Sequence, residues 1–145
     1  MKDFVISKAE KKDFLEIAKI LVDESSKKPY NENYNLKMGI KKIIELSKKE
    51  LYVAKTQREI IGFIASNITS DDRKKAYIDE LWLKARYHRN GIGKILVKFV
   101  EKLYKQKKVK IIRLVAKRNA GAFKFYKKLK YHEHKKLVFM EKKIK

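Results

Sequence analysis

The sequence predicts a mixed α/β fold whose central sheet is mostly antiparallel. Three β-prone segments between residues 51 and 83 are joined by short polar turns, which favours an antiparallel meander. An amphipathic helix then separates the strand at 75–83 from the strand at 110–116, and such a crossover makes these two strands parallel. The order β-α-α-β-β-β-α-β-α-β predicts about six to seven strands, with about four helices distributed over both faces of the sheet.

Hydrophobic periodicity and turn residues define the individual elements. Ser7 and Glu10 have the spacing of a capping box before the first helix, and Asn119 is expected to cap the last helix. A polar loop at 25–35 contains the only proline, Pro29, and separates the first two helices. Strands are predicted at 4–8, 51–55, 60–68, 75–83, 110–116 and 136–142, and helices at 11–24, 36–47, 91–107 and 120–130.

Length and composition predict a single domain that spans residues 1–145. Hydrophobic residues make up 44% of the chain, which is enough to bury a core. The absence of cysteine excludes disulfides, thiolate metal sites and a cysteine nucleophile, and it fits a reducing compartment. No apolar run approaches about 20 residues and no apolar signal region is evident, so we expect a cytoplasmic protein that does not engage the membrane.

The net charge of +22 is concentrated in the second half of the chain. Residues 1–83 contain 17 Lys+Arg and 14 Asp+Glu, whereas residues 84–145 contain 22 and 3. Such a field favours polyanionic ligands, namely a nucleotide cofactor, an acidic protein or nucleic acid. The alternative is a set of solvated, lysine-rich helix faces with no binding role.

A turn that ends in Gly91 lies between a predicted strand and a predicted helix. The first turn of a helix offers free backbone N–H groups and the positive end of the helix dipole, and glycine lets an anion approach the backbone. Arg86, Arg89 and Lys94 add positive charge nearby. The segment therefore predicts a seat for a phosphate-bearing ligand; a tight turn into a core helix is the alternative. It is neither a P-loop nor a dinucleotide fingerprint, whose third glycine position is Leu96 here.

Two short motifs follow one another, and Asn119 lies 28 positions after Gly91. The first motif is His88-Arg89-Asn90-Gly91-Ile92-Gly93, and the second combines Asn119, Ala122, Phe125, Tyr126 and Leu129. In this order, and in these elements, they resemble the GNAT superfamily of N-acetyltransferases, and the resemblance extends over nearly the whole chain. The sequence departs from the superfamily at His88, where Arg or Gln is usual, and at Lys130-Tyr131, where the pattern closes with Gly-Phe.

The resemblance implies that acetyl-CoA is the donor. In such enzymes the fourth and fifth strands splay, the pantetheine arm pairs with the backbone of the fourth strand, and the pyrophosphate lies on amides of the glycine turn. A pyrophosphate also suits a helix N-terminus on physical grounds. The cofactor-binding residues that this implies are Leu81, Trp82, Leu83, His88, Arg89, Asn90, Gly91, Ile92, Gly93, Lys94, Asn119 and Tyr126.

Two residues are candidates for proton transfer. By resemblance, Tyr126 is the general acid for the CoA sulfur; the alternative is an amphipathic aromatic residue on the packed face of its helix. Glu80 is the candidate base, acting through water from the fourth strand, where it shares a face with Trp82. The alternative is an ordinary exposed strand carboxylate. The backbone N–H of Trp82 or Leu83 is a candidate donor to the thioester carbonyl.

The acceptor site is predicted to include Tyr30 and Tyr34, from the loop between the first two helices, together with Glu80. That loop shapes the acceptor pocket in such folds, although a polar surface loop is the alternative. No metal is expected, because His132 and His134 share a strand face without an evident third ligand.

The predicted function is transfer of an acetyl group to a primary amine of a small molecule or a protein by direct attack in a ternary complex, in a monomer or homodimer. The alternative is a GNAT-like fold that binds nucleic acid or an acidic partner.

Overall fold

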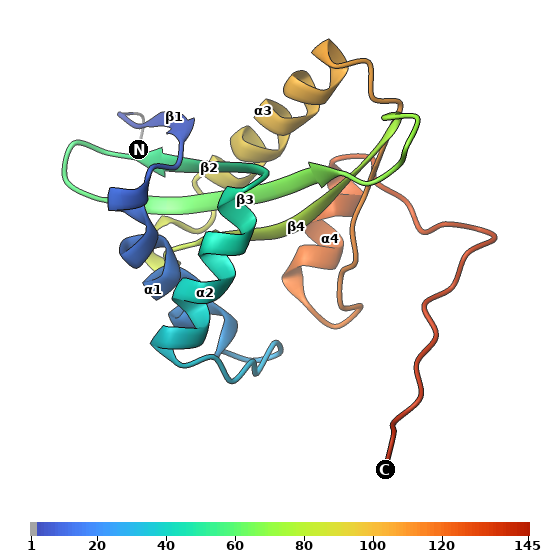
Figure 1. Cartoon of the computed structure of the whole chain (residues 1–145), viewed down its shortest axis with the longest axis horizontal. Coiled ribbons are helices and arrows are strands. Elements are labelled where there is room, and N and C mark those ends of the chain that lie inside the picture. Colours follow the sequence, from blue (N-terminus) through green and yellow to red (C-terminus); the bar gives the residue numbers. More distant parts are fainter. Residues whose placement is uncertain (1–2) are drawn as a thin grey trace. The chain divides into compact units, whose positions relative to one another are not determined.

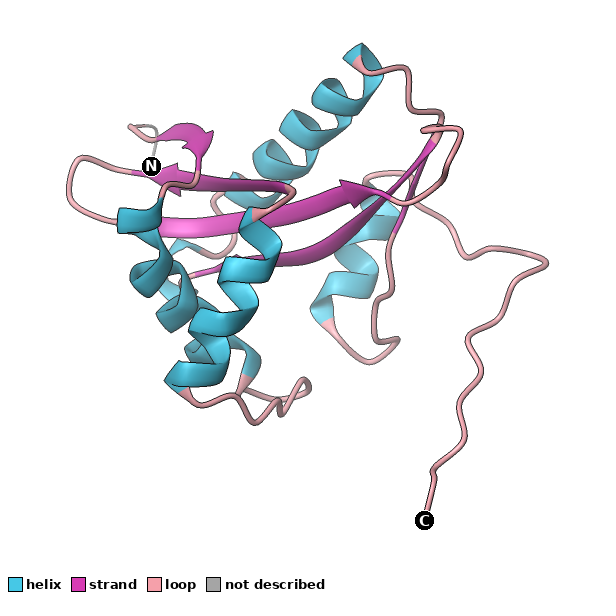
Figure 2. Cartoon of the chain, viewed as in Figure 1, coloured by secondary structure: helices cyan, strands magenta, loops and turns pink. Residues whose placement is uncertain are grey.

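The computed structural model describes residues 3–145, which form two compact units, one ending at Val115 and one spanning Ala116–Lys145 (Figures 1 and 2). The strands are β1 (Val5–Lys8), β2 (Glu50–Lys55), β3 (Ile60–Ile68), β4 (Lys75–Leu83) and β5 (Ile111–Arg113). The helices are α1 (Phe14–Ser25), α2 (Leu36–Ser47), α3 (Ile92–Gln106) and α4 (Gly121–Lys128), with short 3-10 turns at Lys11–Asp13 and Ala85–Tyr87. No helix among the described residues is long and apolar enough to cross a bilayer.

The first unit contains one sheet with the strand order β1-β2-β3-β4-β5. Strands β1 to β4 pair antiparallel, and β5 pairs parallel with β4 after the α3 crossover. The predicted α/β class, the central meander and the parallel crossover are therefore confirmed. The predicted strand count is too high, because β5 covers only part of 110–116 and residues 136–142 form no strand.

The β-prone segment 136–142 pairs with no strand among residues 3–145. The amides of Lys136 and Leu137 donate instead to Nδ1 of His134, at 3.0 and 2.9 Å. The side chains from Leu137 to Met140 are 57–84% exposed. A strand exists only where a neighbouring edge accepts its hydrogen bonds, and propensity alone does not supply that edge.

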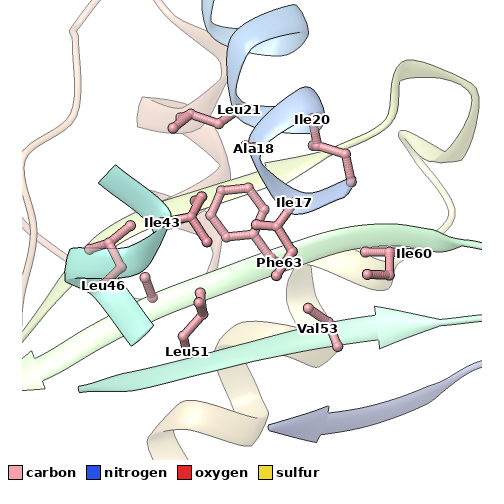
Figure 3. Packing of buried hydrophobic residues seen from close by; sticks show 11 residues of the cluster. Ile17, Ala18, Ile20, Leu21, Ile43, Leu46, Leu51, Val53, Ile60 and Phe63 are labelled. Carbon is pink, nitrogen blue, oxygen red and sulfur yellow. The ribbon is translucent and has the colours of Figure 1, made fainter. Parts of the chain in front are cut away.

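Helices cover both faces of the sheet in the first unit. On one face, α1 and α2 pack over β2 and β3, and Figure 3 shows Phe63 of β3 enclosed by Ile17 and Ile43 of these helices. Each such fully buried side chain contributes about 1.5–3 kcal/mol. Three positions beyond Phe63, Ser66 lies on the opposite face, where its hydroxyl is 2.8 Å from that of Tyr104 in α3.

The helix caps differ from those predicted. The N–H of Glu10 donates to Asp13 at 2.9 Å, so the capping interaction joins Glu10 with Asp13 rather than with Ser7. Asp13 is buried and is paired with Lys55 at 2.9 Å, which explains why Glu10 forms the capping box with Asp13 and not with Ser7. Asn119 does not cap α4, because the N-cap position is occupied by Ala120, which makes no side-chain cap.

Candidate active site

The edge of β4 that faces β5 is paired over only part of its length. Strand β5 pairs with Lys75–Tyr77, and no strand among residues 3–145 pairs with the same edge from Ile78 to Leu83. Lys84 N–H donates to the Ile61 carbonyl on the β3 side, so alternation turns the backbone groups of Leu83 and Leu81 toward the unpaired side. An edge of this kind can pair with an extended ligand.

A β-bulge interrupts β4 where this unpaired edge begins. Glu80 pairs with Ala65, while the next residue of β3, Ser66, pairs with Ile78, so Asp79 is the extra residue. The side chain of Asp79 accepts a hydrogen bond from Asn67 at 2.7 Å. A bulge bends the strand and redirects the side chains beside it, and here those residues include Glu80.

The glycine turn places an anion-accepting helix start directly after β4. Arg89 and Gly91 have left-handed backbone conformations, with φ of +66° and +78°. A Cβ on Gly91 would meet nothing within 4 Å, so the backbone angle, not crowding, favours glycine there. The first intrahelical bond of α3 runs from Ile95 N–H to the Gly91 carbonyl at 3.1 Å. The preceding amides, of Ile92, Gly93 and Lys94, have no acceptor within the helix.

Glu59, in the β2–β3 turn, fixes the segment that leads into the glycine turn. Its carboxylate accepts hydrogen bonds from Lys84 at 2.6 Å, from Arg86, and from the Tyr87 hydroxyl at 2.7 Å. These hydrogen bonds, with the one from Lys84 as the largest cause, lower the pKa of Glu59 to about 2. Glu59 therefore stays charged and positions the turn at neutral pH.

We expect Glu59→Gln to destabilise the folded state at pH 7 by about 1 kcal/mol, because ion pairs near the surface, such as these partly exposed ones, contribute little individually. The folded-state pKa of Glu59, about 2, lies below its usual value of 4.5, so this contribution is fully present above pH 4.5. It is lost as the pH falls toward 2. Urea unfolding at several pH values measures it. Glu45→Gln, which removes an exposed pair with Lys48, is the control; a stability difference independent of pH would contradict the prediction.

A second cluster lies on the face of β4 that carries Glu80 and Trp82. The indole N–H of Trp82 donates to Glu80 at 2.6 Å, and Lys42 of α2 pairs with the other carboxylate oxygen at 3.2 Å. Tyr30 packs edge-on against Trp82, with ring centroids 4.9 Å apart. The ammonium of Lys42 lies 5.9 Å from the ring centroid of Tyr34. The structure thus brings together Tyr30, Tyr34 and Glu80, and it places Lys42, which the sequence did not single out, beside them.

Lys42 remains protonated in this environment. Partial burial lowers the pKa of Lys42, but the charge and hydrogen bonding of Glu80, with a further contribution from Tyr34, outweigh burial and raise the pKa above 10.5. Lys42 lies three residues after Gly39 and four before Leu46, and both of these residues are buried. This helical spacing, which places Lys42 beside the packed face of α2, was the available sequence signal. Among 39 basic residues that signal is too weak to single out one lysine.

The imidazole of His88 turns back toward β4. Its Nε2 lies 2.9 Å from the Leu83 carbonyl oxygen, which can only accept, so Nε2 carries the proton. The same nitrogen is 3.8 Å from the Glu24 carboxylate of α1. His88 therefore connects the end of β4 to the glycine turn. No group of three metal-ligating side chains occurs in the described part of the chain.

Tyr126 and Asn119 belong to the second unit. The ring of Tyr126 packs edge-on against Phe125 and Tyr131, with centroid distances of 4.9 and 5.4 Å, and the residue is 8% exposed. Asn119 is exposed in the turn before α4. Within this unit, Arg118 pairs with Glu133 at 2.5 Å, which ties that turn to the segment following α4.

An unpaired strand edge can pair with an extended ligand, and a helix start can accept an anion, so the two together suit a ligand with an extended, amide-bearing arm and a phosphate group. The model of the Acetyltransferase (GNAT) family matches residues 10–131. The chain therefore belongs to the GNAT family of acetyltransferases.

Solved structures agree with this fold. A possible acetyltransferase from Clostridium difficile 630 is 20% identical, with 99% of this chain and 100% of the other covered and a TM-score of 0.82. An aminoglycoside acetyltransferase from an uncultured soil metagenomic sample is 19% identical, covers 98% and 97%, and has a TM-score of 0.72. A ribosomal-protein-alanine N-acetyltransferase from Brucella melitensis biovar Abortus 2308 is 14% identical, covers 96% and 98%, and has a TM-score of 0.74. No curated protein sequence matched the chain.

Proposed function

We propose that the chain transfers an acetyl group from acetyl-CoA to a primary amine by direct attack in a ternary complex, with residues 1–145 acting as one domain. The observation that carries this proposal is the succession of an unpaired β4 edge and a helix start with free amides. A pantetheine arm carries amides that can pair with a strand, and a pyrophosphate suits a helix N-terminus. Acetyl-CoA contains both groups in this order.

The cofactor contacts follow from this succession. The pantetheine arm would pair with the outward backbone groups of Leu81 and with the N–H of Leu83, since the Leu83 carbonyl lies 2.9 Å from His88 Nε2. Trp82, whose backbone pairs with Phe63 of β3, would hold this part of β4 in place. The pyrophosphate would lie on the amides from Arg89 to Lys94. Asn119 and Tyr126 of the second unit are further proposed contacts, on the basis of their sequence motif. When bound, acetyl-CoA supplies the activated thioester.

Acetyl transfer needs an amine that has lost a proton, a stabilised oxyanion and a protonated leaving thiolate. Glu80 is the proposed base, acting through water, and Tyr126 is the proposed acid. Of the two candidate oxyanion donors, alternation along β4 favours the N–H of Leu83, because that of Trp82 points toward β3.

The acceptor is a primary amine of a small molecule or a protein. Two of the similar structures carry names that specify an aminoglycoside and ribosomal-protein alanine, which supports an amine acceptor of either kind. The family membership favours this enzyme over a module that only binds nucleic acid or an acidic partner.

Calorimetric titration with acetyl-CoA tests the proposal. We expect saturable binding to the wild-type protein, and weaker binding of S-acetylpantetheine, which lacks the pyrophosphate. Gly91→Ala forces a side chain into a left-handed conformation, at a cost of about 1–2 kcal/mol, and distorts the amides that receive the pyrophosphate. This variant should lose affinity for acetyl-CoA and keep its affinity for S-acetylpantetheine. Absence of acetyl-CoA binding at millimolar concentration would overturn the proposal.

A further inference from the structure

The proposed base already binds a protonated amine that belongs to the chain itself. The ammonium of Lys42 lies 3.2 Å from one oxygen of the Glu80 carboxylate and 5.9 Å from the Tyr34 ring centroid. The side chain of Lys42 is 35% exposed and that of Glu80 is 16% exposed. The pair therefore lies at the margin of the first unit's interior, where solvent and solutes can reach the ammonium.

The residues around this ammonium have the composition of a cation site. A carboxylate and aromatic faces are the groups that recognise an alkylammonium ion. The second oxygen of Glu80 is fixed by the indole N–H of Trp82 at 2.6 Å, and Tyr30 packs edge-on against that indole. Because that oxygen is fixed, the first oxygen stays directed at the position that Lys42 now occupies.

We propose that Lys42 is a displaceable occupant of the acceptor site, and that the acceptor is a protonated aliphatic amine that enters by exchanging with the Lys42 ammonium. This inference rests on the proposed function, because it assigns the cluster around Glu80 to the acceptor. Exchange replaces one ammonium by another, so the half-buried carboxylate never loses its counter-charge. A neutral alcohol or an uncharged aromatic amine provides no such compensation and is excluded.

Lys42 is suited to leave the site. Its side chain has four flexible carbons and is 35% exposed, so the ammonium can swing out into solvent. Its raised pKa keeps it charged, so that it can pair with Glu80 when the acceptor is absent. Its withdrawal also removes one positive charge from the site as a cationic acceptor arrives, which matters in a chain with a net charge of +22.

Trp82 is the only tryptophan in the chain, so its fluorescence reports on this cluster alone. We would titrate the protein with n-butylammonium chloride, which copies the lysine side chain, and with n-butanol as a neutral control, at constant ionic strength. We expect a saturable change with the amine and none with the alcohol. Lys42→Met should bind the amine about tenfold more tightly if Lys42 fills the site about nine-tenths of the time.

Lys41→Met is the matched control, since it removes an exposed charge from the adjacent position of α2; its affinity should equal that of the wild type. Glu80→Gln should abolish the response. Far-UV circular dichroism confirms folding, and Lys42→Gln replaces Lys42→Met if the latter unfolds. Equal amine affinities for wild type and the Lys42 variant, or an equal response to n-butanol, would overturn the inference.

The result is distinguishable from a failure of the proposed function. Calorimetry measures the binding of acetyl-CoA to the β4 edge and the α3 start, whereas Trp82 fluorescence measures the binding of the amine beside Glu80. Normal acetyl-CoA binding combined with no effect of Lys42→Met refutes the exchange alone. If the wild-type protein does not bind acetyl-CoA, the proposed acetyltransferase function is refuted, whether or not the amine binds.

Discussion

Tyr126→Phe is expected to lower kcat by about 10²- to 10⁴-fold, the range that a positioned acid contributes. The substitution removes only the phenolic hydroxyl, so the ring keeps its edge-on packing against Phe125 and Tyr131. The affinity for acetyl-CoA should change little, because the proposed hydroxyl acts on the leaving thiolate and not on the bound thioester. Release of free CoA with a saturating amine measures kcat, and calorimetry measures the affinity.

Tyr131→Phe is the matched control for that experiment. Its ring lies 5.4 Å from the ring of Tyr126, so this substitution removes a hydroxyl from the same aromatic cluster and leaves the Tyr126 hydroxyl in the protein. We expect turnover within about threefold of the wild type, since this hydroxyl has no proposed role in the chemistry. Equal turnover of Tyr126→Phe and wild type would refute the acid role and leave Tyr126 as a packing residue.

The parts of the fold that the sequence predicted well are those set by local chemistry. Hydrophobic periodicity determines α3, because Ile92, Leu96 and Val100 all become buried on one side of the helix. Gly91 ends a turn that requires a left-handed angle, so its position follows from a backbone constraint. The predicted helix 91–107 and the observed α3 differ by one residue at each end.

The failures concern features that depend on distant partners. Segment 136–142 has the composition of a strand, but pairing requires an edge elsewhere in the chain, and composition does not reveal one. Asp13 displaces the predicted Ser7–Glu10 box because Lys55, 42 residues away, pairs with it. The sequence did not single out Lys42 for the same reason, since its significance comes from Glu80, which lies in β4 on the other side of the helix–sheet interface.

Glu80→Gln is expected to lower kcat/KM by about 10²- to 10⁴-fold and to change the lower limb of the pH–rate profile. A base acts only in its ionised form, so in the wild type the rate falls as acid protonates the carboxylate. Glutamine does not titrate, and the residual rate of the variant should lose this limb. Glutamine still offers an oxygen to the Trp82 indole N–H, so the strand and its aromatic neighbours keep their positions. Initial rates of CoA release across the acid range measure the profile.

The Asp79→Asn variant tests whether the change in the pH–rate profile is specific to Glu80 or follows from the loss of any nearby negative charge. Asp79 is the bulge residue next to Glu80, and its carboxylate binds Asn67 at 2.7 Å without contacting the amine cluster. Removing this charge should leave the lower limb in place, because the titrating group that limits the rate is still present. If Glu80→Gln also kept the wild-type profile, the proton would leave the amine by another route. Lys42 would then be paired with a carboxylate that only binds the acceptor, since amine recognition requires the charge of Glu80 but not its titration.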